Sequence, residues 1–378
     1  MNNPIWIMTS AFPQLTFDQI VEQVREIGAQ GMELCVFRRD GTRQDHVATH
    51  IDYETFDREA AVRLLDRIGR EGLRISIGSY DNMIGGDPAV RVANQNHILK
   101  LIRIAHLLGG DANDIVVGTF VGYNHELGAQ DGGFEKNLEL YRKVFGPIVK
   151  YAEDLGVTLC YENCPMEGWQ PLSAPSTYNN LPCCLAARKL MYALIPSKAH
   201  GETYDPSHDV WQHINPSDVL RNSDMARVRR IHIKGTRNRY DSLAIHWGRL
   251  FPVNAVPADL AARAGVPTSA SEWDRHHYDP RLPGFGGSDS MDWAEFLETL
   301  NSLGFSGPFS IENEGCNSSH TGSFGATVQG FKATVLNTAP VVWPLDPVKG
   351  YAFDASALRP LAPAAAKDIP VVTMDQLA

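Results

Sequence analysis

The stretch FEKNLELYRKVFGPIVKYAEDLGVTLCYE, residues 134–162, contains the unit from which most of the chain is built. Residues 134–155 have the pattern of an amphipathic helix, and Gly156 follows as a helix-stopping residue. Residues 157–161 then form a short apolar run typical of a buried strand, and Glu162 comes directly after it. Short strands that alternate with amphipathic helices predict a parallel sheet with helical crossovers.

The same strand–helix unit occurs eight times along the chain. In the first unit the helix opens at Thr16, whose hydroxyl can cap free backbone amides, and places its apolar residues on one face. Eight such pairs predict a (β/α)8 TIM barrel, a fold that typically needs roughly 250 residues. The expected strands are residues 5–10, 31–37, 73–79, 114–119, 157–161, 201–204, 229–234 and 308–311.

Two segments exceed what a simple barrel requires. Residues 235–289, after the seventh strand, are mostly irregular in pattern and far longer than an ordinary loop, which suggests a lid or a partner surface. The tail at 337–378 is rich in proline and alanine, and we expect it to wrap the outside of the barrel. We therefore expect one catalytic domain over residues 1–336, including the insertion, followed by a C-terminal extension.

Composition narrows the class of protein. With 43% hydrophobic and 21% charged residues, the chain resembles an ordinary globular protein and not a disordered one. A net charge of −10 argues against nucleic-acid binding, which usually needs a concentrated basic patch. The six cysteines lack the paired spacing of a zinc knuckle or disulfide framework. No secretory signal or membrane span is apparent, so a cytoplasmic protein without a membrane partner is expected.

Four predicted strand ends carry side chains that commonly bind metals. Glu162 and Asp205 follow the fifth and sixth strands, His232 lies within the seventh, and Glu312 follows the eighth. The C-terminal ends of barrel strands converge on one mouth, where catalytic residues lie. Each residue alone also has an ordinary interpretation: a solvated glutamate, a turn-forming aspartate before proline, or a packed histidine. Their joint placement at four successive strand ends favours a shared site.

Three carboxylates in a narrow mouth repel one another unless a cation compensates them. Carboxylate oxygens with one imidazole suit Mn²⁺ or Mg²⁺, while Co²⁺ and Zn²⁺ are also compatible. We therefore expect one divalent metal, with Mn²⁺ as the first choice. Such a metal polarises a substrate carbonyl, and carboxylates on either face of the neighbouring carbon can remove and return a proton.

At these residues the sequence resembles the xylose isomerase-like TIM barrel superfamily over about residues 5–336. This superfamily includes sugar isomerases, ketose 3-epimerases, dehydratases and apurinic endonucleases. The resemblance implies metal binding by the four residues named above. It further implies that Glu162 and Glu312 exchange protons with the substrate and that His208 contacts substrate or metal-bound water. The motifs that carry it are Tyr161-Glu162-Asn163-Cys164-Pro165-Met166, Tyr204-Asp205-Pro206-Ser207-His208, Ile231-His232-Ile233-Lys234, Leu282-Pro283-Gly284-Phe285-Gly286, Met291-Asp292-Trp293 and Ser310-Ile311-Glu312-Asn313-Glu314.

The chain departs from that family at two places. Gly235 stands where many members have an acidic residue, with Thr236 and Arg237 after it, and Arg237 becomes a candidate substrate contact. The insertion and tail are longer than in simple epimerases, which favours a larger substrate or a partner subunit. The catalytic subunits of C-glycoside deglycosidases resemble this superfamily, and they cleave 3-oxo-glycosides together with a smaller subunit.

His125, in the loop after the fourth strand, is either an additional base for such chemistry or an exposed loop histidine. The expected substrate is a keto-sugar or an oxidised glycoside, and the expected reaction is isomerisation, epimerisation or β-elimination. We expect a homo-oligomer or a hetero-oligomer with a small subunit. Two alternatives remain: an apurinic endonuclease, which would need further histidines at the third and fourth strand ends, and a non-catalytic sugar-binding barrel, which would have lost a ligand.

Overall fold

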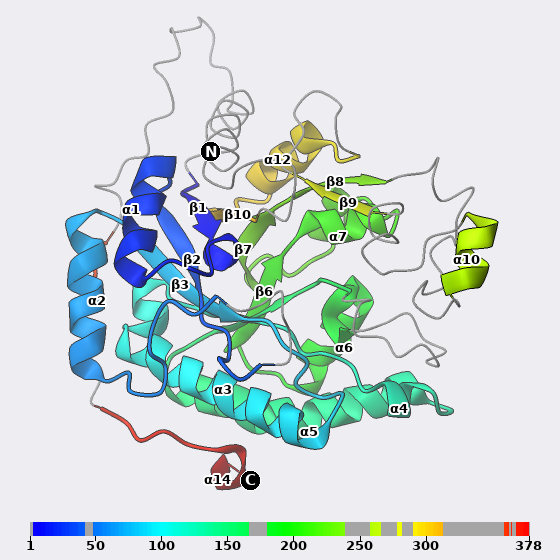
Figure 1. Ribbon diagram of the computed structural model, residues 1–378, viewed down its shortest axis with the longest axis horizontal. Coiled ribbons are helices and arrows are strands. Elements are labelled where there is room, and N and C mark those ends of the chain that lie inside the picture. The colour runs from blue at the N-terminus through cyan, green and yellow to red at the C-terminus, as the bar shows by residue number, and fades with distance from the viewer. Residues whose placement is uncertain are drawn as a thin grey trace, which may run out of the picture.

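A closed barrel of eight parallel strands forms the centre of the molecule (Figure 1). The computed structural model describes residues 3–41, 48–165, 180–238, 258–265, 278–281, 290–312, 359–362, 364 and 368–377. The barrel closes where β1 pairs with β10, with Trp6 opposite Ser310. The predicted (β/α)8 fold is thereby confirmed. Around the barrel the strands are β1 Ile5–Met8, β10 Phe309–Ile311, β7 Val228–Ile233, β6 His200–Tyr204, β5 Leu159–Glu162, β4 Val117–Thr119, β3 Arg74–Ser79 and β2 Gly31–Cys35.

Helices surround these strands, and local sequence explains where they begin. The predicted cap at Thr16 is confirmed, since its hydroxyl accepts a hydrogen bond from the Gln19 backbone amide in a capping box. Gly28 ends the same helix with a φ of 82°, in the left-handed region that favours glycine. The longer helices are α1 Phe17–Ile27, α2 Arg58–Arg70, α3 Pro88–Leu107, α5 Gly133–Asp154, α6 Leu185–Leu194 and α12 Trp293–Ser302.

Short helices lie between the main elements. After the sixth strand, where the sequence analysis gives no helix bounds, residues 206–211 and 216–221 each form a helix with proline at its first position and an Asp or Asn cap before it. The fourth strand is shorter than predicted, because Asp114 has a left-handed φ of 61° and follows a 3-10 turn. The short helices are η1 Thr9–Ala11, η2 Gly110–Asn113, α4 His125–Gly128, η4 Leu181–Cys183, α7 Pro206–Trp211 and α8 Pro216–Arg221.

Part of the insertion has regular structure. Its first strand, β8 Gly235–Asn238, pairs antiparallel with β9 Tyr278–Arg281, and α10 Ala258–Ala264 lies between them in sequence. The expectation of mostly irregular structure is therefore wrong for these residues. The eighth strand–helix pair predicts a last helix near residues 323–336, and these residues lie outside the described part of the chain.

The described residues of the C-terminal extension pack against the outside of the barrel's helices. Asp368 forms a 2.6 Å ion pair with Arg103, and the Met374 amide donates a 2.9 Å hydrogen bond to Asn96, both on α3. The terminal helix α14 Met374–Leu377 lies beside α3 and α5 (Figure 1). In the described part of the chain, no helix combines the length and apolar character needed to cross a membrane.

Candidate active site

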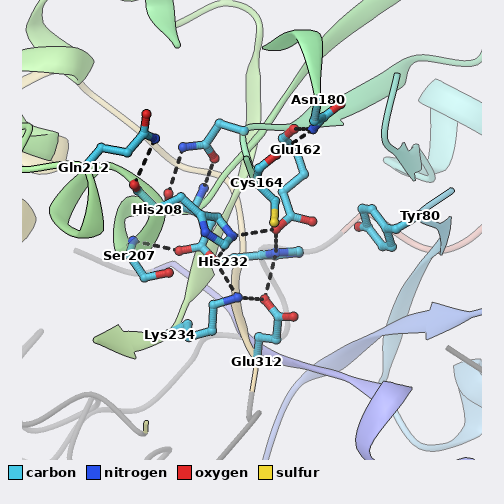
Figure 2. Close-up of polar contacts among 12 residues, drawn as sticks. Tyr80, Glu162, Cys164, Asn180, Ser207, His208, Gln212, His232, Lys234 and Glu312 are labelled. Carbon is cyan, nitrogen blue, oxygen red and sulfur yellow. Dashed lines mark hydrogen bonds and ion pairs between the residues drawn. The ribbon is translucent and has the colours of Figure 1, made fainter. Parts of the chain in front are cut away.

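Four side chains from successive barrel strands meet at one end of the barrel. Glu162 is the last residue of β5, Asp205 follows β6, His232 lies in β7 and Glu312 follows β10. One ligand atom from each lies within 4.8 Å of those from the other three, and all four side chains are buried. His232 Nδ1 is 3.7 Å from Glu162 Oε1 and 3.4 Å from Glu312 Oε2. The structure therefore brings together the four residues that the sequence predicts as metal ligands. Figure 2 shows three of them, Glu162, His232 and Glu312.

Neighbouring backbone segments hold two of these carboxylates in place. Asn163 donates a 2.9 Å hydrogen bond to the Asp205 carbonyl, and its own side-chain oxygen accepts a 2.8 Å bond from the Asp205 amide. The Asn180 amide donates a 2.9 Å bond to the Glu162 carbonyl. Asp205 also caps α7, accepting from the Ser207 amide at 2.8 Å. These bonds lock the ends of β5 and β6 together, so the two carboxylates face the same space.

Two basic side chains share the site. Lys234 Nζ lies 3.1 Å from both Asp205 Oδ2 and Glu312 Oε2. His208 Nε2, on α7, lies 3.3 Å from Glu162 Oε1 and 3.3 Å from Asp205 Oδ2. His208 therefore lies beside two carboxylates of the cluster, and its contact with substrate or metal-bound water stays a prediction. Lys234 belongs to a motif noted in the sequence, yet its sequence position alone did not indicate this bridging role.

The electrostatic environment keeps the carboxylates ionised. Burial alone would raise the pKa of Glu162, but His232 and His208 beside it lower that pKa to about 2. Lys234 lowers the pKa of Glu312 in the same way, against the opposing effect of burial. The surrounding carboxylates, Glu33 and Glu162, outweigh burial and raise the pKa of His232 well above its ordinary value. The site is therefore a dense array of charges with almost no contact with water.

The donor set fits a divalent cation. Asp205 Oδ2 and His232 Nδ1 are buried, and neither makes a hydrogen bond with the described residues. Both atoms belong to the four-residue cluster, and buried polar atoms normally have a partner. Three carboxylates and one imidazole are ligands that Mn²⁺ and Mg²⁺ accept. A cation bound among them would give both atoms the ligand contact that their neighbouring charged side chains do not supply as a hydrogen bond.

A second group of possible ligands overlaps the first. Cys164 lies beside Glu162 and His208, with one ligand atom from each within 4.8 Å of the others. This cysteine occurs in a motif noted in the sequence, but no role was assigned to it. Among the described residues, the strand ends of β3 and β4 are followed by Tyr80 and Phe120, so they add no histidine to the site.

The other face of His232 contacts residues that the sequence reasoning did not single out. Its Nε2 lies 2.9 Å from Glu33 Oε2, and Arg230 Nη1 lies 3.0 Å from the same oxygen. Tyr80 donates its hydroxyl hydrogen to the other oxygen of Glu33. The available signal was a charged residue in the middle of the apolar strand Gly31–Cys35, where an unpaired carboxylate is costly.

Two predicted residues are not joined to this cluster by any contact among the described residues. His125 begins α4 and stacks edge-on against Tyr123 with ring centroids 5.5 Å apart. Its ring nitrogens are buried and have no hydrogen-bond partner in the described part of the chain, and burial lowers its pKa. The exposed-loop interpretation is therefore wrong for those atoms, while its role as a base stays a prediction. Arg237 is exposed on β8, between the buried residues Thr236 and Asn238.

Comparison with known proteins agrees with this architecture. The chain is similar to a structure of L-ribulose 3-epimerase, at 14% identity over 89% of this chain and 95% of that one, with a TM-score of 0.55. A D-tagatose 3-epimerase-like protein matches at 17% identity over 89% and 98% of the two chains, with a TM-score of 0.58. A probable 3-DHS dehydratase from Bacillus anthracis matches at 15% identity over 87% and 98%, with a TM-score of 0.55. At these identities the likeness shows the fold.

No curated protein sequence matches the chain. The model of the family described as xylose isomerase-like TIM barrel matches residues 21–322, which is most of the chain. The chain therefore belongs to the xylose isomerase-like TIM barrel family.

Proposed function

We propose that the protein is a divalent-metal-dependent enzyme that moves a proton next to the carbonyl of a keto-sugar. The observation that carries this proposal is the buried cluster of Glu162, Asp205, His232 and Glu312, in which Asp205 Oδ2 and His232 Nδ1 have no hydrogen-bond partner among the described residues. A non-catalytic sugar-binding protein would have no need for so many charges in one buried place, because burying charges is costly.

The four residues of the cluster would hold the cation. Oxygen ligands dominate the set, so Mn²⁺ is the first choice, and Mg²⁺, Co²⁺ and Zn²⁺ are compatible with the same groups. A bound divalent cation would polarise the substrate carbonyl and so make the neighbouring C–H bond more acidic.

The protein's own side chains would then handle the proton. Glu162 and Glu312 are held ionised, so each can accept a proton from carbon. They reach the cluster from β5 and β10, on either side of β6 and β7, so one carboxylate would take the proton from carbon while the other, once protonated from solvent, would return a proton from the opposite side. His208 and Lys234 carry N–H groups at the same place and would donate hydrogen bonds to substrate oxygens.

A sugar is the substrate class that we favour, because solved structures with the same fold include proteins described as L-ribulose 3-epimerase and D-tagatose 3-epimerase-like. The insertion at 235–289 favours a larger molecule, such as a glycoside oxidised at the sugar 3-position. In that case the same proton removal would be followed by loss of the group β to the carbonyl. The larger substrate would also suit an assembly with a second, smaller subunit.

Deuterium incorporation tests the reaction directly. Metal-loaded enzyme is incubated in D2O with candidate ketoses and 3-oxo-glycosides, and the carbon beside the carbonyl is examined by NMR. We expect label at that carbon in an epimer, in an isomer and in recovered 3-oxo-glycoside. Elimination leaves the same carbon of the product without hydrogen and is identified by the released aglycone. An epimer or isomer formed without label would argue for hydride shift and against the proposed proton transfer.

Substitution of Glu162 and Glu312 tests their proposed role in proton transfer. Glu162→Gln and Glu312→Gln should each lower turnover by at least about a hundredfold, the range typical of lost acid–base catalysis. Glu139→Gln, at an exposed position on α5, is the matched control and should behave like wild type. Metal analysis of the wild type should find one divalent ion per chain. If no such ion is bound and Glu312→Gln retains full activity, the proposal fails.

A further inference from the structure

Glu33 is a carboxylate at the centre of the barrel, with no exposed surface. It lies on β2, three strands from β7 around the barrel, in the order β2, β1, β10, β7. Its Oε2 atom is 2.9 Å from His232 Nε2 and 3.0 Å from Arg230 Nη1. Both contacts come from β7, where Arg230 and His232 are two residues apart and therefore point to the same side of the strand.

The barrel interior leaves room for this carboxylate and for Tyr80. A Cβ atom at Gly78 would lie 3.0 Å from Glu33 Oε1 and 2.9 Å from the Tyr80 ring. A Cβ atom at Gly118 would lie 2.8 Å from Glu33 Oε1 and 2.3 Å from the Tyr80 hydroxyl. Two neighbouring strands, β3 and β4, therefore carry glycine where any larger residue would displace the Glu33–Tyr80 pair.

The two nitrogens of His232 face different groups. Nε2 faces Glu33, while Nδ1 faces Glu162 and Glu312 and makes no hydrogen bond with the described residues. A carboxylate can accept hydrogen bonds but cannot donate them when ionised, so the nitrogen facing Glu33 must carry a hydrogen. The lone pair of a neutral His232 is consequently on Nδ1, directed into the cluster.

We infer that Glu33 is a positioning residue, which fixes the tautomer and ring orientation of His232 so that Nδ1 is the metal-binding nitrogen. This inference rests on the proposed function. Histidines that bind metals usually donate their other N–H to a carboxylate, carbonyl or water, and loss of that partner typically weakens metal binding by 10- to 100-fold. Arg230 completes the arrangement, since it compensates Glu33 when His232 is neutral.

A buried ion pair with a purely structural role would look similar, so the test needs a readout that stability does not change. The chain offers a matched pair: Arg188 and Glu202 lie 3.1 Å apart, and both are almost fully buried. Glu202 contacts Arg188 and Tyr192 on α6. Among the described residues, neither Arg188 nor Glu202 forms a hydrogen bond or ion pair with the four residues of the cluster. The double variant Arg188→Met/Glu202→Met therefore removes a buried ion pair while leaving the site intact.

Three proteins are compared with the wild type: Glu33→Gln, Glu33→Met/Arg230→Met, and the matched control. The glutamine keeps an oxygen that can accept from both His232 and Arg230, so it tests whether the hydrogen bond suffices. Metal-free samples labelled with ¹⁵N-histidine report the His232 Nε2–H group by NMR, with Zn²⁺-loaded samples identifying the coordinating nitrogen. Titration calorimetry gives the affinity for Mn²⁺, and thermal unfolding reports stability.

We expect a slowly exchanging Nε2–H signal and Nδ1 coordination in the wild type. Glu33→Met/Arg230→Met should lose that signal and bind Mn²⁺ 10- to 100-fold more weakly, whereas Glu33→Gln should keep the signal with a smaller loss of affinity. The control should bind Mn²⁺ within about twofold of the wild type, however much less stable it is.

Three results would overturn the inference. One is Zn²⁺ coordination through Nε2 in the wild type, and another is unchanged Mn²⁺ affinity in Glu33→Met/Arg230→Met. The third is an equal loss of affinity in that variant and in the control. If the wild type itself binds no divalent cation, the proposed function fails, and the inference fails with it. That case is recognisable because all proteins then give no binding heat while the wild-type Nε2–H signal remains.

Discussion

Replacing Lys234 with methionine tests the charge balance on which the site depends. The Lys234 side chain is 2% exposed, and its ammonium lies 3.1 Å from each of two buried carboxylates, Asp205 and Glu312. Methionine keeps most of the side-chain volume and removes the charge. Loss of one partner from a buried ion pair costs about 3–5 kcal/mol. Because His208 still lies 3.3 Å from Asp205, we expect the lower end, about 3 kcal/mol, in metal-free protein.

A divalent cation should offset this loss, because it supplies the positive charge that the variant lacks. A ligand at a thousand times its Kd stabilises the folded state by about 4 kcal/mol. Removing Lys234 also leaves the site one unit more negative, and charges a few Å apart interact strongly in such an environment. We therefore expect the variant to bind Mn²⁺ at least about tenfold more tightly than the wild type, which corresponds to about 1.4 kcal/mol.

Urea unfolding with and without MnCl2 gives the stability difference, and titration calorimetry gives the Mn²⁺ affinity. Lys150→Met is the matched control, since Lys150 pairs with Asp154 on the exposed surface of α5 and should affect neither quantity. Weaker Mn²⁺ binding by Lys234→Met than by the wild type would refute the reasoning. Equal stability of the two metal-free proteins would refute it as well.

Three further predictions concern protonation. Carboxylates around His232 outweigh burial and raise its pKa well above the ordinary value, so metal binding should release about one proton. The affinity for Mn²⁺ should therefore rise about tenfold per pH unit below that pKa. Calorimetry in two buffers of different ionisation heat checks this, and a pH-independent affinity would contradict it. Burial lowers the pKa of His97 to about 4 from 6.5, so its contribution to stability is complete above pH 6.5 and falls as the pH decreases, by about 2 kcal/mol at pH 5. Urea titrations should show this fall in the wild type but not in His97→Phe. A hydrogen bond from Cys183 and backbone amides at the start of α6 lower the pKa of Cys184 to about 6. At neutral pH iodoacetamide should therefore modify Cys184 faster than the other described cysteines, and the rate should fall below pH 6. Mass spectrometry that finds another of the described cysteines labelled first would disprove this.

Much of the fold could be predicted because its signals are local. The Thr16 capping box, the apolar face of the first helix and the strand before Glu162 each depend on residues within a few positions of one another. The boundaries that were wrong also have local causes: the left-handed Asp114 shortens β4, and the proline-initiated helices α7 and α8 are too short for a periodic pattern. Glu162 and Asp205 could be found because each comes directly after a strand.

The partners of these residues could be identified only from the folded chain. Glu33 and His232 are 199 positions apart, and nothing in the sequence around either one indicates the other. Barrel closure brings β2 and β7 to face each other across a narrow interior, and the glycines of β3 and β4 leave the space in which the two side chains meet. Local sequence was thus sufficient for the strand order and for the four ligand-type residues, since both follow from short-range patterns. Packing across the closed barrel decided which nitrogen of His232 faces the cluster. It also decided which basic side chains, Lys234 and His208, lie beside the carboxylates of the cluster.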